Sequence, residues 1–499
     1  MCVRDEVTAA SRAIFLQESC CTPPHRVLGC VHLCAFVVLS GVTDSMVFCG
    51  IDIGTTSTKG IVLDERGRVV DEATLPTPMA SARTYWYEHF CRIMQLFAER
   101  GQFADRSVAC SVTGQGGSFV LLDAQHQPVG NVCCWTELAE DTIVQDLADA
   151  FGQTEYYHVT GWPPHGWLAA AKLRQMVERK QVPEGACHMA TVPDLVYAQF
   201  LGELLTDVTS AQITGLVDFQ GRRWSPAILD WIEMDESWLP SIVPGLSVLA
   251  EDIESPWGNL TLVTGSHDQY AAMEAAGLER DTCVMLGTGT AWVLDGRTSG
   301  PVFDDARFLI HPGRDVRPDC YGLIVTLWQV GAGLDKLLRH SGLTQASLTE
   351  LEAAFAGMSV PEGPVRVNLD AGEVEPSGDA ATSVRRYMEW AGSTVAHALE
   401  VCGLKHSLER IVATGGAMAS RFWPQTISSI CGLTLEAVDC ASFTAYGAAL
   451  HARTALLGPD RSQRFPNTAT IRTYTPQRSQ EYREWYCRHQ RPSLDWQCH

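Results

Sequence analysis

The chain has 499 residues, of which 46% are hydrophobic and 19% are charged, so it is long enough for two or three globular domains. Its 37 basic and 58 acidic residues give a net charge of −21, which argues against a nucleic-acid partner because binding to phosphate backbones needs clustered Lys and Arg. No apolar run approaches the roughly 20 residues of a membrane span, so we also expect no membrane partner.

The eighteen cysteines are scattered and form no C-x-x-C pair. Metal sites and small disulfide frameworks need tighter, repeated spacings, so we expect reduced thiols and a cytoplasmic protein.

Residues 1–45 differ from the rest, because they contain the apolar stretch VLGCVHLCAFVVLSGV (27–42) without a signal-peptide cleavage pattern after it. We interpret residues 1–45 as an extension outside the fold, with Met46 as the natural start.

From Val47 onward, short apolar strands alternate with segments of helical spacing, which is typical of α/β architecture. In the first half, strands are expected at 46–54, 59–64, 107–115, 118–123 and 261–265, and helices at 168–180 and 268–278. In the second half, a strand pair is expected within 283–296, helices at 385–404 and 421–433, a strand at 410–416 and a helix at 478–490.

Both halves open with a strand, a turn bearing Gly-Thr, and a second strand. This partial repeat predicts a domain duplication, with an N-terminal domain at 46–270, a C-terminal domain at 271–458 and a tail with a helix at 459–499. Two similar domains imply a cleft between them.

The first turn lies in GIDIGTTSTKGIVLD, which starts at Gly50. A hairpin turn rich in Gly, Thr and Ser leaves backbone N–H groups and hydroxyls free to bind phosphate oxygens, and Asp52 directly before it could hold a hydrated Mg²⁺. A Thr-rich hairpin end without a ligand is the alternative, but the second turn at Gly287 and Thr288 favours a pair of phosphate loops.

Asp268, in GSHDQ, falls where a strand ends and a helix begins. The helix N-terminus stabilises a carboxylate there, so Asp268 is a candidate general base; a simple N-cap is the competing interpretation. His267 beside it is interpreted as a packed or solvent-facing histidine.

In ATGGAMASRFWPQ (413–425), the glycines would let a ring or ribose approach the backbone, although a plain strand-to-helix turn is the alternative.

The order of these elements resembles the FGGY family of carbohydrate kinases, over nearly the whole chain from Met46 to about Arg453. TGQGGSFVLLD (113–123) and LGELLTDVTSAQ (201–212) match further segments of that family. The resemblance implies two ribonuclease-H-like domains of the actin-like ATPase type, and transfer of the γ-phosphate of ATP, with Mg²⁺, to a hydroxyl of a small ketose or polyol.

The resemblance also implies roles for particular residues. Asp268 would be the general base and Asp52 the magnesium anchor, acting through water. The residues that would bind phosphate are Gly54, Thr55, Thr56, Ser57, Lys59, Gly287 and Thr288. Those that would bind adenosine are Gly415, Gly416, Ala417 and Ser420. Those that would bind the acceptor are Gln115, Glu137, Asp268 and Gln269.

The acceptor side departs from the family pattern. WTELA (135–139) replaces W-x-D-x-R, so Glu137 takes the acidic position and Ala139 removes the arginine, and Gly116, Gly117 and Ser118 stand where relatives carry bulkier residues. Phosphorylation of a small non-sugar metabolite, and a non-catalytic sugar or nucleotide sensor that kept the kinase fold, therefore stay open as alternatives. A homodimer is expected from the frequency of such assemblies.

Overall fold

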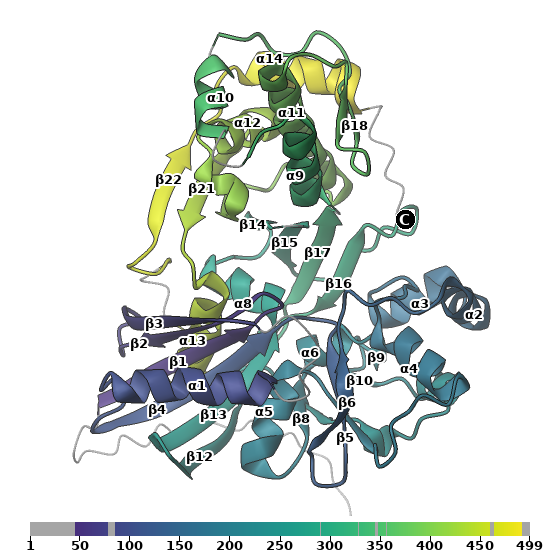
Figure 1. The fold of residues 1–499 in the computed structure, drawn as a ribbon, viewed down its shortest axis with the longest axis vertical. Coiled ribbons are helices and arrows are strands. Elements are labelled where there is room, and N and C mark those ends of the chain that lie inside the picture. The colour runs from purple at the N-terminus through teal and green to yellow at the C-terminus, as the bar shows by residue number, and fades with distance from the viewer. Residues whose placement is uncertain are drawn as a thin grey trace, which may run out of the picture. The chain divides into compact units, whose positions relative to one another are not determined.

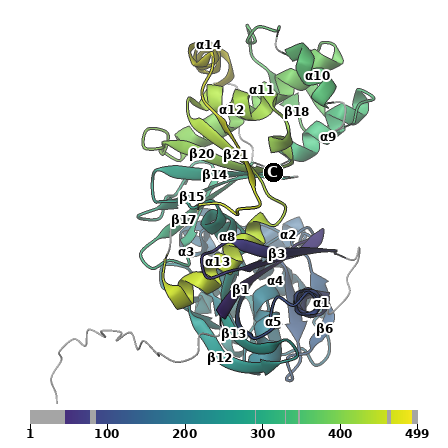
Figure 2. The same ribbon diagram turned by 90° about the vertical axis from the view of Figure 1, so that its left-hand side faces the viewer.

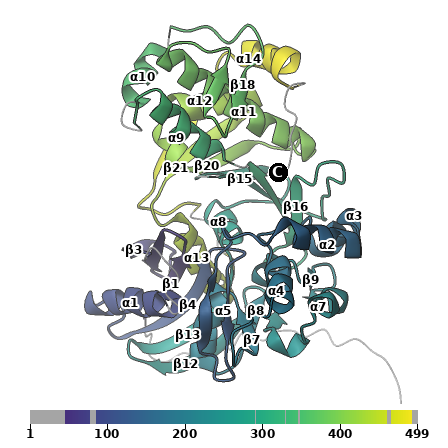
Figure 3. The ribbon, with the colours of Figure 1, turned by 45° about the vertical axis from the view of Figure 1, so that its right-hand side comes forward.

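The computed structural model describes residues 45–77, 85–289, 291–327, 329–344, 348–355, 357–459 and 464–491. These described residues form one compact unit, which Figures 1 to 3 show in colour. The expected extension, 1–45, lies outside the described residues except for Ser45, which is the first residue of strand β1. In the described part of the chain, no helix has the length and apolar character needed to cross a membrane.

The first large sheet has six strands in the order β12-β13-β4-β1-β2-β3. Strands β1, β2 and β3 form an antiparallel meander, β4 and β13 run parallel to β1, and β12 closes the edge antiparallel to β13. Their bounds are Ser45–Ile53 (β1), Ser57–Leu63 (β2), Val69–Pro76 (β3), Arg106–Gly114 (β4), Val248–Ser255 (β12) and Gly258–His267 (β13).

The second large sheet repeats this arrangement. Its order is β16-β17-β15-β14-β20-β21-β22, with β14, β15 and β17 antiparallel, β20 and β21 parallel to β14, and β22 antiparallel at the edge. Its strands are Cys283–Thr288 (β14), Trp292–Thr298 (β15), Ile310–Arg314 (β16), Tyr321–Leu327 (β17), Arg410–Gly415 (β20), Thr434–Asp439 (β21) and Thr470–Tyr474 (β22). The expected α/β fold with two duplicated sheets is therefore confirmed.

Helices and four small sheets of two or three strands accompany these sheets among the described residues. The N-terminal half contains α1 (Tyr85–Glu99), α2 (Asp141–Phe151), α3 (Gln153–Thr160), α4 (Ala169–Glu178), α5 (Val192–Leu201), α6 (Val208–Gln212) and α7 (Pro226–Ile232). The C-terminal half contains α8 (Asp268–Ala275), α9 (Val330–His340), α10 (Leu348–Phe355), α11 (Ala380–Val401), α12 (Phe422–Cys431), α13 (Phe443–Leu457) and α14 (Ser479–Trp485). The remaining strands are β5 (Phe119–Leu122), β6 (Pro128–Cys133), β7 (His188–Ala190), β8 (Leu205–Asp207), β9 (Val217–Asp218), β10 (Arg223–Trp224), β11 (Ser241–Val243), β18 (Arg366–Asn368) and β19 (Glu373–Glu375).

Helix α13 packs on the first sheet, although in the chain it lies between strands β21 and β22 of the second (Figures 1 and 2). It approaches β1 so closely that a Cβ on Gly50 would lie 2.0 Å from the carbonyl oxygen of Ala445. A Cβ on Gly447 would likewise lie 1.7 Å from the carbonyl oxygen of Ala271 in α8. Glycine at these two positions is therefore what lets α13 lie against β1 and α8.

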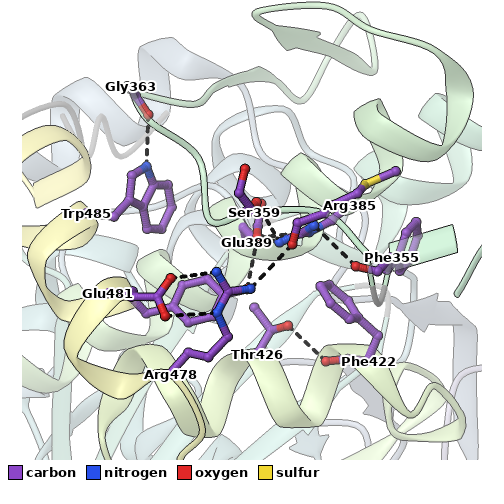
Figure 4. A network of polar contacts seen from close by, with 12 residues as sticks. Phe355, Ser359, Gly363, Arg385, Glu389, Phe422, Thr426, Arg478, Glu481 and Trp485 are labelled. Carbon is purple, nitrogen blue, oxygen red and sulfur yellow. Dashed lines mark hydrogen bonds and ion pairs between the residues drawn. The ribbon is translucent and has the colours of Figure 1, made fainter.

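The segment assigned to the tail also contributes to the second half. Strand β22 extends the second sheet, and α14 docks on α11 and α12 (Figure 4). The Tyr482 hydroxyl donates to Glu389 Oε1 at 2.9 Å, and Arg385 donates to the same oxygen from Nε at 3.1 Å. Because this buried carboxylate is satisfied by two donors, α14 is held by a specific polar contact as well as by apolar packing.

Candidate active site

The turn between β1 and β2 is a tight hairpin in which the Gly54 N–H donates to the Ser57 carbonyl at 3.0 Å. A Cβ on Gly54 would lie only 3.1 Å from that oxygen, so glycine suits the turn. Asp52 comes just before it and pairs in register with Lys59 on β2. The hairpin therefore places a carboxylate and an ammonium group beside a Gly-Thr turn.

The environment of Asp52 is unusual for a carboxyl group. Burial, and secondly the charge of Asp268, raise the pKa of Asp52 to about 7, while Lys59 acts in the opposite direction. Asp52 and Asp268 are thus near enough to repel each other when both are ionised. A cation between or beside them would relieve this repulsion.

Asp268 is the first residue of α8 and follows directly on β13. The junction is held by backbone contacts: the Thr113 hydroxyl donates to Ser266 O at 2.7 Å, and the His267 N–H donates to Thr209 Oγ1 at 2.9 Å. Thr209 in turn donates to Asp207 Oδ1 at 2.5 Å. This chain of bonds fixes the backbone at the start of α8, from which the carboxyl group of Asp268 extends.

His267 points into the site, which the sequence did not reveal. Its Nε2 lies 3.0 Å from Asp268 Oδ1, although the two groups are not aligned as a hydrogen bond, and Oδ1 has no hydrogen-bond partner among the described residues. The ring fits because position 116 carries no side chain: a Cβ on Gly116 would lie 2.3 Å from His267 Cδ2 and Nε2. Gly116, which stands where relatives carry a bulkier residue, therefore makes room for the histidine beside Asp268.

A cavity of about 230 Å³ connects these groups, and we call it the carboxylate cavity. Its polar lining comes from the ends of β1, β4 and β13, the start of α8 and strand β17, and it comprises Asp52, Thr55, Gln115, His267, Asp268, Gln269 and Thr326. The described residues that line it include no Lys or Arg. A neutral ligand, or one accompanied by a cation, suits this lining better than a free anion does.

The opposite wall of the carboxylate cavity is apolar and contains Trp135, Trp162 and Trp167, together with Val293 and Ile324 from the second sheet. Indole faces of this kind bind the C–H surfaces of small ligands while polar groups on the other side fix their orientation. Residues from both sheets therefore surround one cavity.

A chain of hydrogen bonds joins this wall to the first turn. Trp135 Nε1 donates to Thr55 Oγ1 at 3.2 Å, and Thr55 Oγ1 donates to Gln115 Oε1 at 2.8 Å. Gln115 Nε2 then donates to the Tyr85 hydroxyl at 2.7 Å. The turn that would hold phosphate is thus hydrogen-bonded to two side chains of the carboxylate cavity.

Asp295 on β15 is a further acidic residue that the sequence analysis did not single out. Its side chain is fully buried, and neither carboxyl oxygen has a hydrogen-bond partner among the described residues. Burial, and then the charge of Asp268, raise the pKa of Asp295 well above its usual range. Both effects favour the neutral form of Asp295.

A separate cavity of about 250 Å³ lies in the second half, and we call it the glycine cavity. Its lining includes Thr288, Gly289, Gly416, Ala417 and Ser420. Thr288 Oγ1 donates to Thr414 O at 2.7 Å, which ties the second Gly-Thr turn to the end of β20. The Ser420 hydroxyl donates to Glu352, also in the lining, so this cavity brings acidic and glycine-rich segments together.

The two cavities contain many of the expected site residues. Asp52, Gly54, Thr55, Gln115, Asp268 and Gln269 line the carboxylate cavity, and Thr288, Gly416, Ala417 and Ser420 line the glycine cavity. Thr56, Ser57, Lys59, Gly287 and Gly415 lie in the same turns and strands but line neither cavity. Glu137 is exposed on the loop after Trp135 and does not line the carboxylate cavity either.

Comparison with protein families agrees with this arrangement. Residues 47–273 match the N-terminal domain of the FGGY family of carbohydrate kinases, and residues 353–456 match its C-terminal domain. The chain belongs to the FGGY family of carbohydrate kinases. It is accordingly an enzyme, a phosphotransferase that uses an alcohol group of a sugar or polyol as acceptor, and ATP is the expected phosphate donor.

Its relatives are distant in sequence. The chain is 25% identical over 443 residues to a glycerol kinase from Gloeobacter violaceus, covering 83% of this chain and 89% of the relative. It is 22% identical over 422 residues to a xylulose kinase from Escherichia coli, covering 78% and 86%. The crystal structure of a xylulose kinase from Rhodospirillum rubrum superposes with a TM-score of 0.78 at 20% identity, over 88% of this chain and 97% of that one, which shows the shared fold.

Proposed function

We propose that this carbohydrate kinase transfers the γ-phosphoryl group of ATP to a hydroxyl of a small ketose or polyol bound in the carboxylate cavity, with Asp268 as general base. The observation that carries the proposal is the position of Asp268 at the start of α8, in a cavity shared by Asp52 and the first Gly-Thr turn. The acceptor oxygen would attack the γ-phosphorus while its proton passes to Asp268. The bond from that phosphorus to the β–γ bridging oxygen breaks, and ADP leaves.

The surroundings of Asp268 suit a proton acceptor. Its buried Oδ1 has no hydrogen-bond partner among the described residues, so it has a lone pair available for a donor. His267, whose Nε2 is 3.0 Å from that oxygen, limits the directions in which the carboxylate can turn.

The carboxylates also fit a magnesium ion. In the described part of the chain, no cluster of three or more His, Cys, Asp or Glu side chains is arranged to cage a metal. Mg²⁺ in nucleotide sites is commonly held by one or two carboxylates together with phosphate oxygens and water, and Asp52 offers such a carboxylate. The bound ion would neutralise phosphate charge, while Gly54, Thr55, Gly287 and Thr288 would position the phosphate groups.

The glycine cavity is the proposed site of the adenosine group. Gly416 leaves open space at the end of β20, since the nearest atom to a Cβ placed there is Thr288 O at 4.0 Å. A flat ring can therefore approach the backbone at this point. The acidic groups at its rim, such as Glu352, are suitable acceptors for ribose hydroxyls.

The names of the relatives support a ketose or polyol as acceptor, since glycerol kinases and xylulose kinases both appear among them. The residues that line the carboxylate cavity also favour such an acceptor. With Gln115 and Gln269 as amide partners and three indole rings as an apolar wall, the carboxylate cavity suits a molecule that has hydroxyls on one side and C–H groups on the other.

The decisive experiment measures ADP release by the full chain with Mg·ATP and a panel of ketoses, aldoses and polyols, beside the Asp268→Asn variant. We expect one class of acceptor to stimulate release, and the variant to lose at least about a hundredfold in kcat. The affinity of the variant for ATP, measured by calorimetry, should change little.

Near-normal turnover in Asp268→Asn would refute the role of this residue. ATP binding without stimulation by any sugar, polyol or other alcohol would refute the proposed reaction and favour a sensor. Asp268→Glu is a useful companion variant, because it keeps the carboxylate and changes only its reach.

A further inference from the structure

A third cavity, of about 120 Å³, lies beside the carboxylate cavity and shares Trp162, Trp167 and Thr326 with it. Its remaining walls come from the loop after α3, which contains His165, and from Phe308 and His311 at β16. Figures 1 and 3 show α3 close to β16, and the Tyr157 hydroxyl of α3 donates to Ile310 O of that strand. We call this space the histidine cavity.

His311 has a polar atom that nothing in the described structure satisfies. Its side chain is 8% exposed and stacks on Trp162 with ring centroids 4.2 Å apart, and its Nδ1 has no hydrogen-bond partner among the described residues. Leaving such a buried group unpaired is unfavourable, because it has lost its hydrogen bonds to water without gaining others. A ligand with one hydrogen-bonding group would remove this cost.

The histidine cavity contains no charged partner for a ligand. The described residues that line it include no Asp, Glu, Lys or Arg, and they are mainly aromatic rings and prolines. Burial, together with nearby His165, lowers the pKa of His311 to about 3, and burial also lowers the pKa of His165. Both imidazoles are therefore neutral at physiological pH, and a carboxylate or phosphate entering the cavity would lose its hydration without compensation.

We propose that the histidine cavity binds the far end of the acceptor, and that the preferred acceptors are uncharged molecules long enough to reach past Trp162 and Trp167 to His311. This inference rests on the proposed function, because it takes the reacting hydroxyl to lie at Asp268. The indole rings would cover the C–H surface of the middle of the acceptor, and His311 would pair with a hydroxyl or carbonyl at its far end. Sugar acids and sugar phosphates are excluded as good acceptors.

The test compares kcat/KM for glycerol, erythritol, arabinitol and mannitol, and for the acids arabinonate and gluconate. The neutral acceptors should improve with length, and each acid should be at least about a hundredfold worse than the neutral polyol of equal length. His311→Leu, which removes the ring nitrogens, should lower kcat/KM about tenfold for the best long acceptor and leave that for glycerol unchanged.

A variant that adds a positive charge to the histidine cavity also tests whether the missing charge is what excludes acid acceptors. Gln153 lines the histidine cavity and is exposed at the start of α3, so Gln153→Arg should leave the fold intact and raise kcat/KM for an acid acceptor at least about tenfold. Gln153→Met, of similar length but uncharged, is the matched control and should not improve the acid. Unfolding midpoints of all variants should match that of the original chain.

Three outcomes would overturn the inference: glycerol as the best acceptor, acids used as well as neutral polyols, or an equal effect of His311→Leu on short and long acceptors. Failure of the proposed function has a different signature, since then no acceptor stimulates ADP release or Asp268→Asn stays active. Calorimetry can also measure the affinity of the long acceptor for Asp268→Asn. This affinity tests binding in the histidine cavity without any turnover.

Discussion

The imidazole of His267 occupies the space that a side chain at Gly116 would need, because a Cβ there would lie 2.3 Å from two of its ring atoms. Two residues 151 positions apart in the chain thus form one feature of the carboxylate cavity, since 267 − 116 = 151. The imidazole beside Asp268 is possible only while position 116 stays a glycine.

The first prediction follows from this pair. Gly116→Ala should push the imidazole away from Asp268 and lower kcat about tenfold, which is about 1.4 kcal/mol in the barrier. His267→Gly should also lower kcat, whereas the double variant should be no worse than His267→Gly alone, because the added methyl group then meets empty space. Steady-state kinetics of the three variants form a double-mutant cycle, and strictly multiplicative effects would show that the two positions act independently.

The second prediction concerns magnesium. Asp52→Asn should raise the Mg²⁺ concentration for half-maximal activity about tenfold or more, because the carboxylate proposed to hold the ion is lost. Glu137→Gln is the matched control: it removes an exposed carboxylate that does not line the carboxylate cavity, and it should leave the magnesium dependence unchanged. Equal responses of the two variants would argue against Asp52 as the anchor, and a large loss of acceptor affinity in Glu137→Gln would restore Glu137 to the acceptor site.

The third prediction uses two neighbouring glycines at the end of β20. Gly415 has φ of 103°, and a Cβ there would lie 2.7 Å from Thr288 O, so Gly415→Ala should lower the free energy of unfolding by about 1–3 kcal/mol. Gly416→Ala projects a methyl group into the glycine cavity instead. Its stability should stay within about 0.5 kcal/mol of the original chain, while its KM for ATP rises about tenfold.

Denaturant unfolding and ATP titrations separate the two effects. An unchanged KM for ATP in Gly416→Ala would place the adenosine group elsewhere. If Gly415→Ala proved as stable as the original chain, the turn at this strand end would have to rearrange at little cost.

The turns and strands of the site could be predicted because their signals are local. The sequence GIDIGTTSTKGIVLD predicted a hairpin with Asp52 before its turn, and the structure has that hairpin between β1 and β2. The start of a helix at Asp268 was likewise predicted, because a strand pattern ends and an apolar helical pattern begins there.

The pairing of Gly116 with His267, and the burial of Asp295, could not be predicted in this way. Both depend on which strands become neighbours in a sheet, and a single sequence does not show which strands pair. The path of α13 was hidden for the same reason, because its apolar pattern shows that it is buried but not which sheet it covers.

The fourth prediction is a dependence of stability on pH. Asp194 forms a capping box with Thr191 at the start of α5, and burial raises the pKa of its carboxyl group from 3.8 to about 7, against the hydrogen bonds from Thr191. The folded state therefore holds this proton more tightly than the unfolded chain does, so the contribution of Asp194 to stability is complete below about pH 4 and is lost as the pH rises to about 7. Asp194→Asn should gain stability relative to the original chain over this interval.

The control is Asp235→Asn, at the exposed N-cap of a short 3₁₀-helix. Hydrogen bonds from Ser237 lower the pKa of Asp235 from its ordinary value of 3.8, so the stability contributed by this carboxylate is complete above that value and is lost only at lower pH. In thermal unfolding between pH 4 and pH 8, Asp235→Asn should therefore differ from the original chain by a constant amount, whereas the difference for Asp194→Asn should change with pH. The same slope in the two variants would mean that the buried proton on Asp194 does not determine the effect.

The path of α13 has a consequence for how the protein is made. A face of the first sheet, including Gly50, is covered by a helix that ends at Leu457, so translation must pass this residue before the face has its partner. The nascent N-terminal half consequently waits with apolar surface uncovered, a state in which chains aggregate or recruit chaperones. Translation that stops before α13 should therefore yield an aggregating product, whereas in a nascent chain that extends past Leu457 by the length of the ribosomal tunnel the N-terminal half should become resistant to protease in a single step.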